Sequence, residues 1–101
     1  MTKLIKIIKS DKPKKKWTAI FKLDNGKEKK VHFGYNNKND KNNDYILHKD
    51  LERRRLYRMR HEKDLKTNDP LRAGFLSYYI LWGDSTDIKK NISSYRKKFN
   101  L

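Results

Sequence analysis

Five of the seven arginines in this chain lie within eight consecutive positions, residues 53–60, in the stretch DLERRRLYRMRH. A guanidinium is a planar fork that binds a phosphate or a carboxylate through two hydrogen bonds, so the cluster either binds an external phosphate or pairs with acids of the protein itself. On a helix, Asp50 has the spacing to pair with Arg54. Glu52 has the spacing to pair with Arg55. Two acids cannot neutralise five arginines, and the members expected to stay free for phosphate are Arg53, Arg58 and Arg60.

Lysine carries most of the remaining positive charge, and much of it gathers early in the chain. The segment KPKKK occupies residues 12–16, and KEKK follows at 27–30. We expect these lysines to converge around one hairpin, where they would contact a phosphate backbone regardless of base sequence. For KPKKK alone, a solvated loop without a ligand and a nuclear import signal are the alternatives. The lysines expected to bind nucleic acid are Lys14, Lys15, Lys16, Lys27, Lys29 and Lys30.

The chain as a whole is strongly basic. It has 27 Lys and Arg against 12 Asp and Glu, a net charge of +15 in 101 residues. Such a charge attracts polyanions, of which nucleic acid, acidic protein surfaces and anionic membranes are the candidates. Lysine, asparagine and isoleucine are all frequent, as in proteins of AT-rich genomes, so codon usage contributes to the lysine excess. It does not explain the scarcity of acids, because aspartate and asparagine codons are similarly placed.

Residues that enzymes use for catalysis do not form a recognisable set. Cysteine, a P-loop and the GxSxG signature are all absent. The run His48-Lys49-Asp50 lacks the spacing of the HKD signature of phospholipase D, and His32, His48 and His61 lack metal-ligand spacing. We predict a protein that is not an enzyme and has no metal or cofactor. A hydrolase would require Asp44, Asp50 and His61 to converge.

Aromatic side chains offer another kind of chemistry, the stacking of nucleic-acid bases. Their alternating and helical spacings favour packing in a core instead. For Trp82, next to Gly83, the pattern decides least between a place in the core and an exposed stacking surface. The aromatic residues weighed in this way are Trp17, Phe21, Phe33, Tyr35, Tyr78, Tyr79 and Trp82.

Three strands are expected to carry the lysines. Residues 3–9 are rich in β-branched isoleucine, and residues 17–23 and 27–35 alternate between apolar and polar side chains around Asn25-Gly26. Asn-Gly favours a type I′ turn, which requires positive φ at both residues. Trp17, Ala19, Phe21 and Leu23 would share one face with Val31, Phe33 and Tyr35 of the partner strand. The segment 36–43, NNKNDKNN, is expected to be a polar loop.

Three helices are expected to follow and to position the arginines. The first runs from an Asp44 cap to about His61. The second starts at Asp69-Pro70 and ends at Gly83, and the third is capped by Ser85 or Thr86. The fold class predicted is therefore α+β, a three-stranded antiparallel sheet followed by three helices over one of its faces. We expect a single domain over residues 1–101, with a β-rich basic hairpin region at 1–35, the loop at 36–43 and a helical region at 44–101.

Several segments of the chain resemble one known group of proteins. The resemblance lies in Asp44-Tyr45, His48-Lys49-Asp50, Arg53-Arg54, Tyr57, Arg60-His61, Ala73-Gly74-Phe75-Leu76-Ser77, Ile80-Leu81-Trp82 and Tyr95-Arg96-Lys97-Lys98-Phe99. With these residues the chain resembles small basic proteins of unassigned function that are encoded by large double-stranded DNA viruses of algae and amoebae. The resemblance implies a viral origin and supplies no catalytic residues.

Charge and resemblance together lead to one expected function and one alternative. The first is a non-enzymatic, sequence-independent nucleic-acid-binding protein of a large DNA virus, associated with the genome or virion, with double-stranded DNA as the favoured ligand. The alternative is a minor capsid or assembly protein that contacts acidic protein surfaces. No apolar run approaches the roughly 20 residues that span a bilayer, and no signal peptide is recognisable. We expect the protein in the virion and inside the host cell, in a viral factory or the nucleus, and not secreted.

Overall fold

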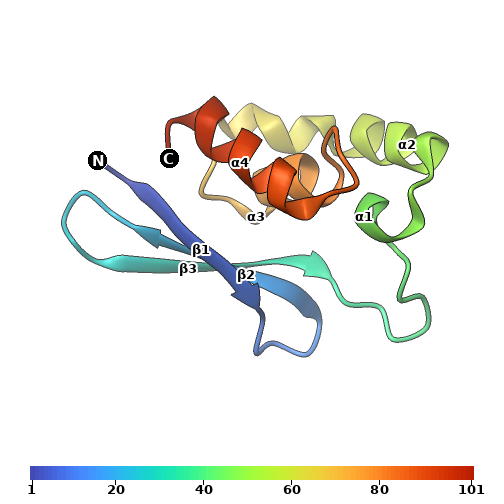
Figure 1. Cartoon of the computed structure of the whole chain (residues 1–101), viewed down its shortest axis with the longest axis horizontal. Coiled ribbons are helices and arrows are strands. Elements are labelled where there is room, and N and C mark those ends of the chain that lie inside the picture. The colour runs from blue at the N-terminus through green and yellow to red at the C-terminus, as the bar shows by residue number, and fades with distance from the viewer.

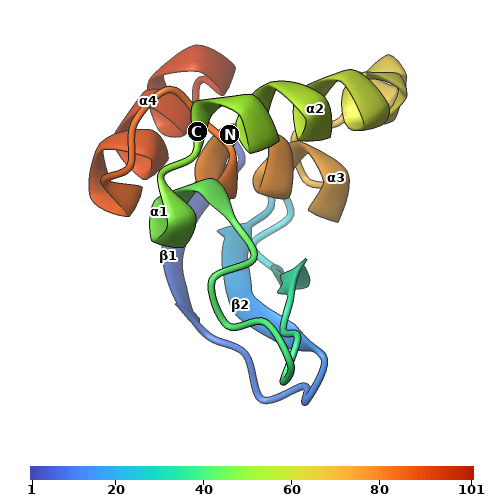
Figure 2. The same cartoon turned by 90° about the vertical axis from the view of Figure 1, so that its right-hand side faces the viewer.

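A three-stranded antiparallel sheet lies beneath a layer of helices in the computed structural model of residues 1–101 (Figure 1). The strands are β1 (Lys3–Lys9), β2 (Lys15–Lys22) and β3 (Glu28–Tyr35), and β2 lies in the middle. Figure 2 shows the helices gathered on one side of the sheet. The predicted α+β class and the order of strands before helices are confirmed.

Helical segments fill the second half of the chain. The α-helices are α1 (Tyr45–His48), α2 (Leu51–His61), α3 (Ala73–Leu76) and α4 (Ile88–Phe99). A 3₁₀ segment, η1 (Glu62–Thr67), follows α2, and a π-helical segment, η2 (Ser77–Leu81), continues α3. None of these helices is long and apolar enough to cross a membrane.

The first predicted helix is broken near its start. Asp44 caps α1 as expected, by accepting a hydrogen bond from Leu47 N. Lys49 then adopts a left-handed conformation with φ of 57° and ends α1. Asp50 begins a new helix, because its carboxylate accepts hydrogen bonds from the backbone N–H groups of Glu52 and Arg53. An aspartate that caps a helix competes with continuation of the preceding one, so the prediction of one helix from Asp44 was wrong.

The other two helices begin later than predicted. Asp69 accepts a hydrogen bond from Leu71 N in a turn, and α3 starts only after Arg72. The cap of α4 is Asp87, which accepts from Lys89 N. In each case the expected cap forms a local turn just ahead of the helix, and Ser85 does the same by accepting from Asp87 N.

The turn between β2 and β3 is not the predicted type I′ turn. Leu23 and Lys27 pair across a three-residue loop, in which Gly26 N donates to Leu23 O. Gly26 has φ of 84°, whereas Asn25 has no positive φ. A type I turn followed by a glycine bulge forms three-residue hairpin loops of this kind, so the hairpin was predicted correctly and its turn type was not.

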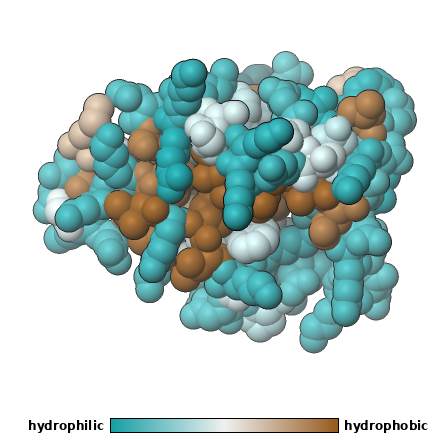
Figure 3. Space-filling model, in the orientation of Figure 1, coloured by the Kyte–Doolittle hydropathy of each residue, from teal (hydrophilic) through white to brown (hydrophobic).

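One core joins the sheet to the helices. Ala19, Phe21 and Phe33 are fully buried on the predicted face of the sheet, whereas Tyr35 at the end of β3 is exposed. Strand β1 contributes Leu4, and the helical half of the chain contributes the remaining members, which are Tyr45, Phe75, Leu76, Ile80, Leu81, Trp82 and Tyr95. Figure 3 shows hydrophobic surface between the two layers, crossed by hydrophilic side chains.

The edge strand β1 is fastened to the last helix through its backbone. Arg96 of α4 donates from Nε to Leu4 O and from Nη2 to Ile5 O, both at 3.1 Å. The pairing between β1 and β2 is irregular at this point, between Leu4 and Lys6. A bulge leaves backbone groups of the strand without ladder partners, and Arg96 supplies donors for two of these carbonyls.

Candidate nucleic-acid interface

Helix α2 has its polar and apolar sides reversed relative to an ordinary surface helix. Its inward side, at spacings of three and four residues, consists of Arg54, Tyr57, Arg58 and His61, and no residue of the helix is fully buried. The large apolar side chains of the helix are exposed instead. Leu51 is 65% exposed, Met59 61% and Leu56 44%. The hydrophobic effect therefore contributes little to the attachment of α2.

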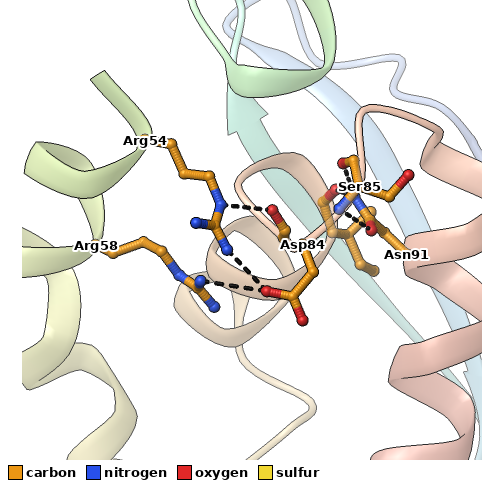
Figure 4. Close-up of polar contacts among 7 residues, drawn as sticks. Arg54, Arg58, Asp84, Ser85 and Asn91 are labelled. Carbon is orange, nitrogen blue, oxygen red and sulfur yellow. Dashed lines mark hydrogen bonds and ion pairs between the residues drawn. The ribbon is translucent and has the colours of Figure 1, made fainter. Parts of the chain in front are cut away.

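Two inward arginines converge on one carboxylate (Figure 4). Arg54 donates from Nε to Gly83 O and from Nη2 to Asp84 Oδ1, both at 2.7 Å. Arg58 Nη1 lies 3.5 Å from the same oxygen, and its guanidinium lies over the Tyr78 ring at 4.7 Å. The side chains of Arg54 and Arg58 are only 19% and 23% exposed. These contacts tie α2 to the turn between η2 and α4.

That turn is itself held by the buried Asn91 of α4. Asn91 Oδ1 accepts from Ser85 N at 3.1 Å, and Asn91 Nδ2 donates to Ile80 O and Ser85 O. A side chain at Gly83 would be impossible, because a Cβ there would lie 2.1 Å from Tyr79 O. Asp84 is therefore presented to the arginines by a rigid turn.

The arginines of the cluster divide differently from our prediction. The pair of Glu52 with Arg55 is confirmed, and their hydrogen bond lowers the pKa of Glu52 and raises that of Arg55. Asp50 caps α2 and does not pair with Arg54, so that prediction was wrong.

The three arginines expected to be free also differ from one another. Arg58 contacts Asp84 and is not free, whereas Arg53 lies 3.7 Å from Asp40 and remains half exposed. Arg60 has no acid partner and is exposed. Of the three, Arg60 alone has no acid partner, as expected, whereas its contact with phosphate stays a prediction.

The lysines of the hairpin do not converge. Lys14, Lys15 and Lys16 lie at the end of β2 that meets the β1–β2 loop, whereas Lys27 lies in the turn at its opposite end. Lys29 pairs with Phe21 and Lys30 with Ile20, so these two neighbours point to opposite faces of the sheet. The expectation of one lysine cluster was wrong, because β2 separates the two groups along its whole length.

Lys16 is also removed from any external role by an internal partner. Its Nζ forms an ion pair with Asp44 Oδ2, in which the two side chains are 13% and 5% exposed. The same carboxylate caps α1. A buried pair of this kind leaves no charge for a ligand. Lys16 therefore fastens β2 to α1, while Lys14 and Lys15 remain exposed.

A groove of about 890 Å³ lies beneath α2 and brings distant residues together. It reaches from the ends of β2 and β3 to α3 and η2. Its cationic residues include Lys15, Arg53 and Arg60, which the sequence placed in two unrelated segments. Its aromatic residues are Tyr35, Tyr57, His61 and Trp82. This groove, called the α2 groove below, is the candidate site of the molecule.

Three rings of the α2 groove form a stack. Tyr57 lies parallel to Trp82, with ring centroids 4.1 Å apart and 3° between the planes. On its other side Tyr57 stacks on His61 at 4.2 Å and 23°. Burial raises the pKa of Tyr57 to about 12. The spacing of Tyr57 and His61, four residues apart on one helix, is the signal in the sequence that could have indicated this pair.

The residues considered for hydrolysis do not meet. Asp44 is bound to Lys16 and caps α1, Asp50 caps α2, and His61 lies 3.0 Å from Asp64. No group of three His, Asp or Glu side chains could hold a metal ion. His48 packs against Trp82, and burial lowers its pKa. The histidines thus have separate local partners.

Comparison with known proteins assigns a family. Residues 5–61 match a family of unknown function, DUF5754. The chain belongs to DUF5754. The matched segment runs from β1 to the end of α2. It contains two of the three stacked rings, Tyr57 and His61, whereas Trp82 and Asp84 lie beyond it. Neither the curated proteins nor the solved structures include a match to the chain.

Proposed function

We propose that this DUF5754 protein binds nucleic acid without sequence preference, as a non-enzymatic protein that contacts phosphates. One observation carries the proposal. Of the 20 lysines, only Lys16 has an acid partner. Of the seven arginines, by contrast, five have one, which are Arg53, Arg54, Arg55, Arg58 and Arg72.

The chemistry of the two side chains explains why arginine is mostly paired with acids and lysine is mostly unpaired. Arginine forms fixed, forked contacts and is used here within the fold. Lysine is a hydrated point charge on a flexible stem, which suits contact with a phosphate chain of any sequence. The net charge of +15 is thus mostly unpaired lysine at the surface.

The positions of the free cations favour a long ligand. Lys14, Lys15 and Arg60 lie near the α2 groove, and Lys27, Lys29 and Lys30 lie around the other end of the sheet. Lys30 pairs with Ile20 and Lys29 with Phe21, five and six residues along β2 from Lys15, so at about 3.3 Å per residue these groups lie about 17–20 Å apart. A nucleic acid spans such a distance with several phosphates, whereas a small anion contacts only one group.

A salt titration tests the proposal. Binding to unrelated duplexes should weaken steeply with salt, with equal slopes for different sequences, because released counterions drive it. Replacing Lys14 and Lys15 by Gln should reduce the slope by about 2, one for each lost phosphate contact. Replacing Lys89 and Lys90 of α4 by Gln is the matched control and should change the slope less. Absence of binding at low ionic strength would reject the proposal.

The proposal extends to the origin of the protein. We infer that it comes from a large double-stranded DNA virus and accompanies the genome in the virion and the host cell, on the basis of the resemblance in the helical region. Fractionation of purified virions tests this point. The protein should occur in the genome-bearing core, and its absence from virions and infected cells would contradict the inference.

One observation supports an assembly role as a second candidate. Helix α2 exposes Leu51, Leu56 and Met59, and the last two line the rim of the α2 groove. Exposed arginines lie beside them, and clusters of Met, Arg and apolar side chains are typical of protein interfaces. An acidic surface of a shell protein would suit this composition. Recovery of the protein with the shell after removal of the genome would favour this role over nucleic-acid binding.

A further inference from the structure

We infer that the α2 groove receives an unpaired base of a single-stranded nucleic acid, with the ring of His61 as the surface on which the base stacks. The inference rests on the proposed function and specifies its ligand. A single strand leaves its base faces open to aromatic side chains, whereas a duplex hides them in its own stack.

The ring stack has one closed end and one open end. Trp82 is nearly buried at the inner end. Tyr57 lies in the middle, and its faces are covered by Trp82 and His61. The side chain of His61 is 40% exposed and lines the groove. A base added at His61 would therefore extend an existing stack by one ring.

His61 is held in a fixed orientation. Its Nδ1 lies 3.0 Å from Asp64 Oδ2. A carboxylate only accepts hydrogen bonds, so Nδ1 carries the proton and donates it. The opposite ring nitrogen, Nε2, has no partner in the protein and is not buried. It is available to the edge of a base or to a sugar hydroxyl.

Phosphate contacts flank this platform. Lys15 and Arg60 line the same groove, and neither has an acid partner. The exposed ring of Tyr35, at the end of β3, also lines it. Cations beside open rings form the pattern of sites that bind single strands, in which phosphates follow the charges and bases stack on the rings. The volume of the groove, about 890 Å³, is sufficient for a nucleotide.

Fluorescence anisotropy with an oligothymidylate strand and with a duplex of equal length tests the inference. At one ionic strength, the strand should bind about tenfold more tightly than the duplex, because stacking adds to the phosphate contacts. His61→Ala should weaken strand binding by a similar factor and change duplex binding less than twofold. His61→Phe keeps a flat ring without the Asp64 hydrogen bond, and should retain most of the strand affinity.

Because His61→Ala could disturb folding, a second measurement uses the unaltered protein and follows the fluorescence of the bound strand. A strand that carries 2-aminopurine should change its emission on binding, because stacking on a ring alters the fluorescence of this base. An unchanged emission, or equal affinity for strand and duplex, overturns the inference and leaves the proposed function standing. No binding of either ligand at low ionic strength overturns the proposed function itself.

Discussion

Helices α2 and α4 have nearly the same length and both carry several cations, yet they are attached to the molecule in opposite ways. In α4, Tyr95 and Asn91 are buried, and Ile88, Ile92 and Phe99 pack against the core. In α2, the inward side consists of two arginines and two rings, and the leucines and the methionine face solvent. Apolar burial thus holds α4, whereas polar contacts and one ring stack hold α2.

This difference in attachment implies that α2 and α4 open at different free energies. A helix fixed by apolar burial unfolds with the whole domain, whereas a helix fixed mainly by polar contacts opens at lower free energy. The α2 groove is therefore bounded on one side by the core and on the other by α2, a helix that opens locally at lower free energy than the core. Such a boundary suits a site that takes up a ligand from solution. Three substitutions and one change of pH test this contrast between α2 and α4.

Removal of the Tyr95 ring should have the largest effect. Tyr95 is 1% exposed, and its hydroxyl donates to Pro70 O. Tyr95→Ala leaves a cavity and should reduce the free energy of unfolding by about 3–5 kcal/mol, as measured by urea denaturation. Lys97→Ala on the exposed side of α4 is the control and should cost less than about 0.5 kcal/mol. A loss below about 1 kcal/mol for Tyr95→Ala would contradict the assignment of α4 to the core.

Alkaline pH should act on the ring stack of α2. Burial raises the pKa of Tyr57 from 10.0 to about 12. Below pH 10 the Tyr57 hydroxyl is protonated in both the folded and the unfolded chain, so its titration does not reduce the free energy of unfolding. Between pH 10 and 12 only the unfolded chain loses the proton, so stability should fall by about 2–3 kcal/mol.

Tyr57→Phe separates this effect from other alkaline titrations. The ring and its stacking remain, while the ionisable group is removed. Urea unfolding across this pH range should be flatter for Tyr57→Phe than for the unaltered protein. Burial also raises the pKa of Tyr95, so part of the alkaline loss should persist in the variant. Identical pH profiles for the two proteins would show that Tyr57 is not buried as described.

Loss of the Asp84 charge should loosen α2 and leave α4 intact. Asp84→Asn removes the carboxylate that Arg54 and Arg58 share. Because Asp84 is largely exposed, the expected cost is only about 1 kcal/mol. Hydrogen exchange should accelerate in α2 and stay unchanged in α4. Equal acceleration in the two helices would mean that they open together and would remove the contrast between them.

Substitution of the exposed methionine of α2, Met59, should have the smallest effect. Met59→Ser changes an exposed side chain, so the free energy of unfolding should shift by less than about 0.5 kcal/mol. Ile92→Ser, the matched change on the apolar side of α4, should cost several times more. A large loss for Met59→Ser would show that this side of α2 is covered.

The sheet was predictable because its signals are local. Alternation in residues 17–23 and 31–35 correctly identified the face that carries Ala19, Phe21 and Phe33. The turn type was missed because Asn25-Gly26 supports a two-residue loop and also the glycine bulge of a three-residue loop. The break between α1 and α2 was missed because Asp50 was considered as a partner of Arg54 and not as a helix cap.

The site was less predictable because its contacts join distant segments. The acid that binds Arg54 is Asp84, 30 residues away, and no local spacing indicates it. Lys16 was counted among the free cations because its partner, Asp44, lies across the polar loop. Lys15 and Arg60 line one groove only because the chain folds α2 over the end of the sheet at which β2 begins. Periodicity indicates which way a side chain points, but not what lies opposite.

The hydrogen bonds from Arg96 to β1 affect whether two copies of the protein can pair through the edges of their sheets. β1 lies at the margin of the sheet, where unsatisfied backbone groups invite strands of neighbouring molecules. The guanidinium occupies the carbonyls of Leu4 and Ile5 and blocks that stretch against a foreign strand. A foreign strand would therefore find the carbonyls of Leu4 and Ile5 already occupied, which disfavours edge-to-edge pairing of two copies along this stretch.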